Sequence, residues 1–315
     1  MREPNPRINW NRLTAFYQTA RFGNIKHACA KLNIDQSTLS RTIQSFEESL
    51  GFKLFSRVSQ GVVMTKQGEI LFKVVEKVLF DVEVALTMAK EEGEVPKGTL
   101  TVATTVALAS LWLVQMMPGF LEKYTDIELY IIGDDERLNL KAREADVLIS
   151  PYIKDSPDLI QTYLFSCNLQ LYASPEYLEK FGCPQTIDDL NDHRLITFGT
   201  NTIRPYSDID WLLRVGLPSG VVRKPYLSIN SSKGASQLAE QGLGIVALSD
   251  EFPQIKELNL VKILPEIQGP IIDLYYIYPQ ILQNSKRVKV FGEYLEEHIP
   301  LEHRKTPNSI SSQNS

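Results

Sequence analysis

Cysteine is scarce in this chain of 315 residues. The three cysteines, Cys29, Cys167 and Cys183, form no C-x-x-C pair. Three scattered thiols are too few for a disulfide framework, and together with four histidines they show no spacing typical of a zinc site. We therefore expect no bound metal and no cofactor.

Long apolar runs and an export signal are lacking as well. No stretch approaches the ~18 consecutive apolar residues that a membrane helix needs, and residues 1–11 are polar. Hydrophobic residues make up 43% and charged residues 23%, as in ordinary globular proteins. We expect a cytoplasmic protein that contacts no membrane and folds as two or three domains of about 100 to 200 residues.

Motifs of common enzymes are also missing. The chain has no G-x-S-x-G, H-E-x-x-H or P-loop motif, and residues 242–244 supply only a fragment of G-x-G-x-x-G, ahead of a predicted strand. His193 lies near three aspartates, but hydrogen bonding within a loop is a sufficient role for it. We therefore predict no catalytic residue and no enzyme.

Positive charge is concentrated at the N-terminus. Residues 1–70 contain 10 Lys and Arg against 5 Asp and Glu, although the whole chain carries a net charge of -5. A basic segment favours an anionic partner, so we expect the small N-terminal part to bind nucleic acid. An ordinary solvated basic surface is the alternative.

Three helices are predicted within the first fifty residues. Apolar residues recur at helical spacing over 11–20 and 25–32, and a third helix runs from Asp35 as N-cap to about residue 50, where Gly51 ends it. Together they form a helix-turn-helix, whose second element enters the major groove of DNA. A structural three-helix bundle is the alternative, but two short strands predicted at 52–55 and 62–65 form a β-wing beside the helix.

The outer face of the third helix carries short or planar hydrogen-bonding groups, which is the chemistry that reads base edges. His27, on the second helix, is expected to pack between helices. We predict that DNA contacts come from this helix and from one arginine of the wing: Gln36, Ser37, Thr38, Ser40, Arg41, Gln44 and Arg57.

A long helix follows the wing. Apolar residues keep helical spacing from Thr65, a predicted N-cap, to about residue 92, a length of ~40 Å at 1.5 Å per residue. Such a helix needs a partner for its apolar stripe, and self-association supplies one. Glycine, proline and glutamates at 91–98 predict a hinge.

Strands and helices alternate in the remainder, which predicts a parallel sheet in two α/β lobes. The predicted strands are 99–103, 128–132, 146–149, 169–173, 195–198, 245–248 and 273–278. The predicted helices are 108–124, 138–144, 175–181, 231–241 and 286–298. The polar tail, 300–315, is expected to be disordered.

The chain resembles the LysR-type bacterial transcriptional regulators. About fifteen positions across 46 residues stand in the order and spacing of that family's winged helix-turn-helix signature: Gly23, Ala28, Leu32, Gln36, Ser37, Ser40, Ile43, Glu47, Gly51, Leu54, Phe55, Arg57, Gly61, Thr65 and Gly68. The resemblance covers about residues 8–298. It implies an α/β protein with an N-terminal all-α winged helix-turn-helix, a long linker helix and a two-lobed effector domain like a periplasmic binding protein.

The resemblance also implies domains and partners. The DNA-binding domain would span 1–66, the linker helix 67–93, and the effector domain 98–298, with lobe I at 98–163 plus 270–298 and lobe II at 164–269. The implied partners are double-stranded promoter or operator DNA, a small-molecule effector, and further copies of the chain, as a dimer through the linker helices and a tetramer through the effector domains.

Effectors of such domains bind between the lobes, at the C-termini of strands and the N-termini of helices. Each polar residue at these points is also a candidate helix N-cap. The predicted effector-binding residues are Thr104, Thr105, Ser150, Thr200, Asn230 and Ser231.

The chain departs from the family pattern at several positions. Lys26 stands where the family usually has Thr or Ser, and His27 where it usually has Ala. Gln60 stands where many members of the family have a wing arginine, and this difference should weaken a contact in the minor groove. Cys167 and Cys183 are similar to the redox pairs of peroxide-sensing relatives, but their spacing and contexts differ.

The predicted function is an effector-responsive, sequence-specific transcription factor. The alternatives are a nucleoid-type DNA-binding protein without ligand response and a solute-binding protein with an accessory interaction domain.

Overall fold

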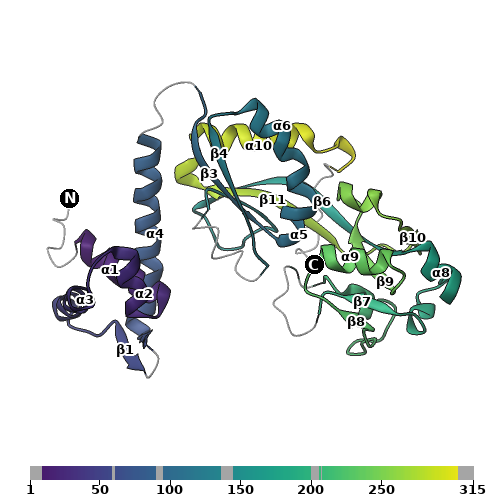
Figure 1. Ribbon diagram of the computed structural model, residues 1–315, viewed down its shortest axis with the longest axis horizontal. Coiled ribbons are helices and arrows are strands. Elements are labelled where there is room, and N and C mark those ends of the chain that lie inside the picture. Colours follow the sequence, from purple (N-terminus) through teal and green to yellow (C-terminus); the bar gives the residue numbers. More distant parts are fainter. Residues whose placement is uncertain are drawn as a thin grey trace. The chain divides into compact units, whose positions relative to one another are not determined.

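The computed structural model describes residues 9–58, 61–89, 95–135, 145–199, 206 and 208–303. The chain divides into two compact units, residues 1–90 and 91–315 (Figure 1). Among the described residues, no helix combines the length and the apolar character needed to cross a membrane.

Three helices open the first unit, and the predictions for them are confirmed. They are α1 (Trp10–Phe22), α2 (Ile25–Leu32) and α3 (Gln36–Leu50). The side chains of Asn9, Asn24 and Asp35 cap their N-termini by accepting backbone N–H groups. Gly23, Asn33 and Gly51 end them in the left-handed conformation, which glycine and asparagine adopt most readily.

The wing consists of the antiparallel strands β1 (Phe55–Val58) and β2 (Gly61–Met64), with Arg57 opposite Val62. The prediction of a first strand at 52–55 is wrong. The backbone N–H groups of Leu54 and Phe55 donate to the Glu47 carboxylate of α3, at 2.8 and 3.1 Å. Strand pairing therefore begins at Phe55, where the predicted strand was expected to end.

Helix α4 (Lys66–Ala89) follows the wing, and its 24 residues span about 36 Å. Thr65 caps it as predicted, because its Oγ1 accepts the N–H of Gly68 at 3.0 Å. The inner face of α4 packs into the core of the unit through Leu71, Phe72, Val75 and Leu79. Half of the predicted hinge at 91–98, namely residues 91–94, lies outside the described residues.

The second unit is built on one mixed sheet with the strand order β4-β3-β5-β11-β6-β9-β7-β8, and β10 pairs beside β6. The strands are β3 (Gly98–Thr104), β4 (Ile127–Gly133), β5 (Val147–Ser150), β6 (Leu159–Ala173), β7 (Leu195–Thr197), β8 (Leu227–Ser228), β9 (Ile245–Ser249), β10 (Val261–Ile263) and β11 (Ile271–Pro279). Pairing is parallel among β3, β4 and β5 and among β7, β8 and β9. It is antiparallel at β6, β10 and β11, so the prediction of a parallel sheet is wrong for these strands.

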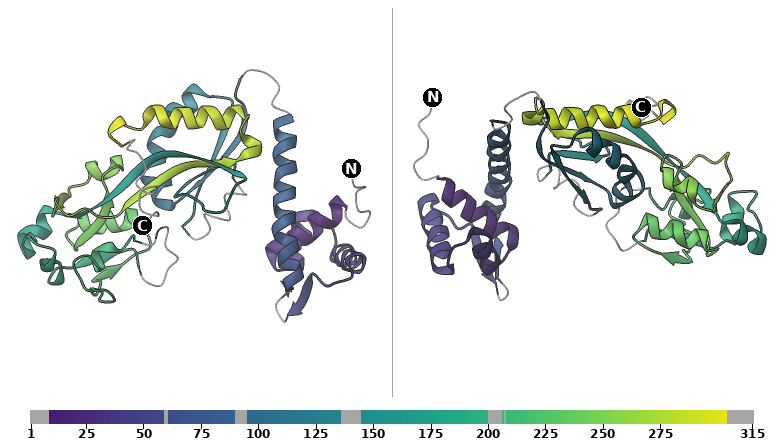
Figure 2. Two further views of the ribbon diagram at one scale, coloured as in Figure 1. Left: turned by 180° about the vertical axis from the view of Figure 1, so that it is seen from behind. Right: turned by 45° about the horizontal axis from the view of Figure 1, so that its top comes forward.

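Strand β6 joins the two halves of the sheet (Figure 2). Its residues 159–168 pair with β11, whereas 169–173 pair with β9 and β10. Only 169–173 was predicted as a strand, because the polar residues between Leu159 and Asn168 hide the apolar pattern.

The helices of the second unit cover this sheet. They are α5 (Val106–Leu108), a π-helical turn (Ala109–Leu113), α6 (Val114–Lys123), α8 (Pro175–Phe181), α9 (Ser232–Glu240) and α10 (Lys286–His298). The helix predicted at 108–124 thus begins two residues earlier and contains a π turn, a feature common near functional sites. The helix predicted at 138–144 and the tail after residue 303 lie outside the described residues.

Helices α6 and α10 lie side by side (Figure 1). The rings of Phe120 and Phe291 meet edge to face with centroids 5.0 Å apart. The Tyr294 hydroxyl donates to the carbonyl of Met116 at 3.0 Å. These contacts attach the C-terminal helix to the half of the sheet that holds β3 and β4.

Candidate nucleic-acid interface and effector site

Helix α3 separates its polar and apolar residues onto two faces. Leu39 and Phe46 are fully buried, and they pack against α1, α2 and α4. Gln36, Ser37, Thr38, Arg41 and Gln44 are exposed, and Ser40 is half-buried. The structure thus places the six predicted residues of this helix on one solvent-facing surface.

The N-terminus of α3 holds a tight hydrogen-bonded cluster. The Asp35 carboxylate accepts the hydroxyls of Ser37 at 2.5 Å and Thr38 at 2.6 Å, and the backbone N–H of Thr38 at 2.9 Å. These donors, the Ser37 hydroxyl foremost, hold the pKa of Asp35 well below its ordinary value of 3.8. Because both hydroxyl hydrogens are used internally, Ser37 and Thr38 present oxygen lone pairs to a ligand. They suit base amino groups as partners.

The hydrogen-bonded cluster at Asp35 should make the free energy of unfolding depend on pH. A carboxylate whose folded pKa is depressed stabilises the fold above its unfolded pKa, and the contribution disappears as pH falls toward the folded value. We expect the wild-type protein to be more stable than Asp35→Asn at neutral pH, with a difference that shrinks as pH falls from about 6 to 2. Asparagine keeps the N-cap and loses the charge. Thermal unfolding across this range checks the expectation, which a pH-independent difference would contradict.

Two further predicted residues differ in their local partners. Gln44 donates its Nε2 to Glu48 Oε1 at 2.9 Å, whereas Arg41 has no hydrogen bond or ion pair within the described part of the chain.

Arg57 lies on β1, but its side chain is outside the described part, as is Gln60. His27 is exposed and meets Phe22 edge to face, so the expectation that it packs between helices is wrong.

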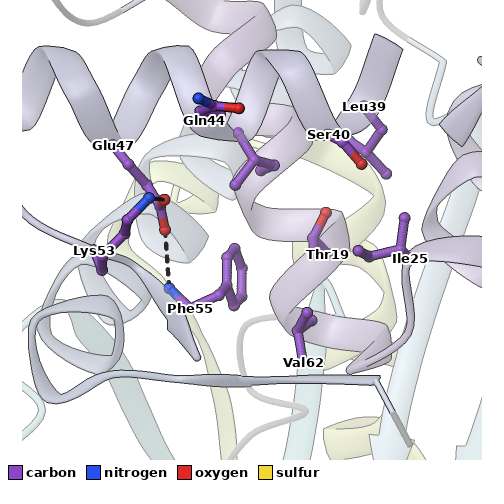
Figure 3. A pocket seen from close by; sticks show the side chains of 10 residues that line it. Thr19, Ile25, Leu39, Ser40, Gln44, Glu47, Lys53, Phe55 and Val62 are labelled. Carbon is purple, nitrogen blue, oxygen red and sulfur yellow. Dashed lines mark hydrogen bonds and ion pairs between the residues drawn. The ribbon is translucent and has the colours of Figure 1, made fainter. Parts of the chain in front are cut away.

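A cavity of about 280 Å³ lies between α3, α1, α2 and the wing (Figure 3). Its lining residues are Thr19, Ile25, Leu39, Ser40, Ile43, Gln44, Glu47, Lys53, Phe55 and Val62. Two residues predicted to contact DNA, Ser40 and Gln44, therefore stand at a recess between the helix and the hairpin.

In the second unit, three predicted effector residues meet at one edge of the sheet. Thr104 and Ser150 end the paired strands β3 and β5, and Thr105 follows directly. All three are buried. Thr104 Oγ1 donates to the Ile149 carbonyl at 2.8 Å, and Thr105 Oγ1 accepts the N–H of Leu108 as the N-cap of α5. The helix-capping alternative therefore applies to Thr105.

A carboxylate that was not predicted lies at the same helix start. Asp135 follows β4, and its Oδ1 accepts the N–H of Val106 at 3.0 Å. Burial raises the pKa of Asp135, and the hydrogen bond from Val106 only partly opposes this effect. A helix N-terminus that could attract an external anion thus already contacts a carboxylate of the protein.

The opposite half of the unit holds the other predicted effector residues. Ser231 caps α9 by accepting the N–H of Gly234 at 3.1 Å, and Asn230 beside it is exposed. Thr200 lies outside the described residues. The hydroxyl of Tyr206, which was not predicted, forms a hydrogen bond with Thr105, and burial raises the pKa of Tyr206.

Two buried acidic residues hold β6 where it passes between the halves. Ser166 donates to Asp273 Oδ1 at 2.6 Å. Asn168 donates its backbone N–H and its Nδ2 to Glu251, at 2.9 and 2.5 Å, and Ser249 also donates to Glu251. Partners brought by β9 and β11 thus satisfy the polar residues that concealed this strand in the sequence.

His193, the histidine that lies near three aspartates in the sequence, takes part in structural contacts. The Tyr177 hydroxyl accepts the N–H of Arg194 at 2.9 Å and lies 3.0 Å from His193 Nδ1. Burial lowers the pKa of His193, which favours the neutral ring. No group of three or more potential metal ligands occurs within the ranges that the structure describes.

The three thiols differ in exposure. Cys29 and Cys167 are buried, Cys183 is exposed, and burial raises the pKa of the Cys167 thiol. We expect one fast-reacting thiol per folded chain with a disulfide reagent such as Ellman's, and none in Cys183→Ser, because the thiolate is the reactive form. All three should react after unfolding. Two fast thiols in the folded protein would contradict this picture and revive the redox interpretation.

A winged helix-turn-helix followed by a long helix and a two-part α/β domain defines a class of DNA-binding transcriptional regulators. The chain belongs to the LysR family within that class. Residues 10–69 match the bacterial regulatory helix-turn-helix protein model of the lysR family, and residues 93–300 match the LysR substrate binding domain. The resemblance seen in the sequence is therefore confirmed.

Known proteins align with this chain over nearly its whole length. The HTH-type transcriptional regulator CrgA of Neisseria meningitidis serogroup B is 26% identical over 297 residues, which are 93% of this chain and 98% of that protein. The CrgA structure aligns with a TM-score of 0.55 at 25% identity, covering 93% of this chain and 99% of that one. ArgP from Mycobacterium tuberculosis has a TM-score of 0.67 at 15% identity, covering 95% of this chain and all of its own, and shows the shared fold. The relatives are named as transcriptional regulators, not enzymes, in agreement with the prediction.

Proposed function

We propose that this LysR-type regulator binds operator DNA through α3 and the wing as a dimer, and that a small molecule bound between the lobes of residues 98–298 controls it. The DNA contacts are those predicted from the sequence, with Arg41 and Ser37 foremost. Residues 1–66 form the DNA-binding domain in this proposal, and 67–93 form the linker. The observation that carries it is the exposed polar face of α3, capped by Asp35.

The linker helix supports the dimer. It exposes Ile70 by 65%, Val74 by 57%, Val78 by 40% and Leu86 by 58%. Ile70, Val74 and Val78 recur every four residues and form one stripe beside the face that packs on α1, whereas Leu86 lies further along the helix, near the side that carries Val75 and Leu79. An apolar stripe of this length is covered economically by the same stripe of a second copy.

The second unit supports a further contact between copies. Helices α5 and α6 expose Val106, Val114 and Leu121, and the edge strand β4 exposes Tyr130 and Ile131. An uncovered sheet edge with apolar neighbours is a surface that proteins usually pair or shield. We propose that this surface joins effector domains into the tetramer.

For the effector, the supporting observation is the group of Thr104, Thr105 and Ser150 at the C-terminal ends of β3 and β5. Polar groups at this position bind ligands in open α/β sheets. The ligand shifts the equilibrium between two relative orientations of the lobes. The free energy of this shift is no larger than the difference between the ligand's binding free energies for the two orientations. Lobe I, at 98–163 plus 270–298, and lobe II, at 164–269, would move about β6.

Selection of duplexes from a random pool by the full-length protein, followed by fluorescence anisotropy at about 150 mM salt, tests the DNA-binding proposal. A sequence-specific regulator should prefer its selected duplex over a scrambled one by roughly 10³-fold or more. Equal, weak binding to both would favour the nucleoid-type alternative. Absence of binding would favour the solute-binding alternative.

A thermal-shift screen of small molecules on the same protein tests the effector. A ligand that binds only the folded state raises the unfolding temperature by mass action. A genuine effector should also change the anisotropy-derived affinity for the selected duplex. A stabilising ligand that leaves DNA affinity unchanged would count against control by a ligand between the lobes.

A further inference from the structure

A buried carboxylate of α3 holds the beginning of the wing. Glu47 is only 7% exposed. Its Oε1 accepts the backbone N–H groups of Leu54 at 2.8 Å and Phe55 at 3.1 Å, and its Oε2 lies 2.7 Å from Lys53 Nζ. One side chain of the recognition helix therefore bonds three successive residues at the base of the hairpin.

Two of these residues, Lys53 and Leu54, also accept hydrogen bonds from Thr65 at the start of α4. Thr65 Oγ1 donates to the Lys53 carbonyl at 2.7 Å, and the Thr65 N–H donates to the Leu54 carbonyl at 2.9 Å. Gly68 lets the helix approach, since a Cβ there would lie 2.3 Å from the Leu54 oxygen. Residues 53–55 thus connect α3 with α4 through hydrogen bonds.

The second strand of the wing is attached elsewhere. Val62 donates its N–H to the carbonyl of Gly23, in the turn between α1 and α2, at 3.1 Å. A Cβ at Gly61 would lie 2.4 Å from the same oxygen. The wing is therefore attached at two places: at the start of β1 to α3 and α4, and at the start of β2, beside the hairpin turn, to the turn between α1 and α2.

Between these attachments lies the cavity of about 280 Å³, with Glu47 and Phe55 joined at one side (Figure 3). A cavity removes the close contacts through which side chains normally hold two elements at a defined distance. Hydrogen bonds to a carboxylate are shorter and stronger than those between neutral groups. Packing contributes as well, because Leu54 and Phe55 lie in the core with Phe46 of α3, and the Glu47 bonds fix where the backbone of these two residues lies against the helix.

We infer that Glu47 is a positioning residue that sets the distance of the wing from α3, so that the wing and the recognition helix engage DNA together. Glu47 acts through the backbone of Leu54 and Phe55 and contacts no base. The inference rests on the proposed binding of DNA by α3 and the wing. It adds the residue that makes the two contacts interdependent.

The test compares Glu47→Gln with wild type on the selected duplex and on a version shortened by the flanking base pairs that the wing would reach. Glutamine keeps one acceptor and the side-chain shape but removes the charge. We expect an affinity loss of about tenfold on the full duplex and of less than about twofold on the shortened one. Glu69→Gln, an exposed change in the first turn of α4, should change neither. Equal losses on both duplexes would overturn the inference.

A double-mutant cycle separates positioning from a general effect on folding. Glu47→Gln combined with Arg57→Ala should bind no worse than the weaker single variant, because both remove the wing contact. Combined with Arg41→Ala, the losses should multiply. Two outcomes would overturn the inference. In the first, Glu47→Gln gives multiplicative losses with both arginine variants. In the second, Arg57→Ala binds DNA like wild type while Arg41→Ala does not.

Circular dichroism at the assay temperature measures the folded fraction of each variant, and each affinity is corrected for that fraction. A Glu47→Gln loss that this correction removes would also overturn the inference, because the residue would then serve stability alone. If neither Arg41→Ala nor Arg57→Ala weakens binding to the selected duplex, the proposed DNA contacts fail, whatever Glu47→Gln does. The two failures are therefore distinguishable.

Discussion

Val74→Glu should convert the protein from a dimer to a monomer. Val74 is 57% exposed in the middle of the apolar stripe of α4, and burying a valine contributes about 1.5 to 3 kcal/mol. In a two-fold symmetric interface the residue counts twice, so the substitution costs roughly 3 to 6 kcal/mol, or about 10² to 10⁴ in the dimer association constant. Light scattering after size-exclusion chromatography measures the mass directly.

The same variant should lose affinity for a two-half-site duplex by at least about 100-fold, because each half-site then binds separately. Val74→Leu keeps the apolar stripe and should remain dimeric. Gln67→Glu adds the same charge to an exposed polar position of the helix and should also remain dimeric. A dimeric Val74→Glu protein with unchanged affinity would show that α4 is not the dimer contact.

Arg41→Ala should reduce affinity for the selected duplex by about 10- to 100-fold, equivalent to roughly 1 to 3 kcal/mol for one base contact. Arg41 is exposed on the polar face of α3 and has no partner within the described part of the chain, so the unfolding temperature should not change. The loss should be concentrated at one base pair of the site. Anisotropy titrations on duplexes substituted one position at a time measure this dependence.

Arg41→Lys distinguishes a base contact from a phosphate contact. Lysine keeps the charge but lacks the planar fork that binds a guanine edge with two hydrogen bonds. If Arg41 reads a base, Arg41→Lys should behave nearly like Arg41→Ala. Retained affinity in Arg41→Lys, with a uniform loss across sequences and a shallower salt dependence in Arg41→Ala, would show a phosphate contact instead.

Elements whose ends are set by neighbouring residues were predictable from the sequence. Helices α2 and α3 begin and end where Asn24, Asn33, Asp35 and Gly51 predict, because capping and left-handed termination involve atoms only a few residues apart. Helical spacing likewise predicted the polar outer face of α3. The polar face of α3 is therefore a local property of the chain.

Elements that depend on distant partners were not predictable in the same way. Strand β6 was predicted for only part of its length, because Ser166 and Asn168 become acceptable there only when Asp273 and Glu251 accept their hydrogen bonds. The wing begins at Phe55 because Glu47 accepts the backbone N–H groups of Leu54 and Phe55. In both places a buried carboxylate from another element determines the pairing.

The chain's family, its helix-turn-helix and the polar composition of the outer face of α3 follow from short-range patterns, since a helical period and a cap need no knowledge of the rest of the fold. Tertiary structure decided which hydroxyls remain available and which strands join the halves of the sheet. It also decided that Asp135 contacts the start of α5 and that Glu47 connects helix and wing. These features bring together groups far apart in sequence, and their strength comes from burial, which only the folded chain provides.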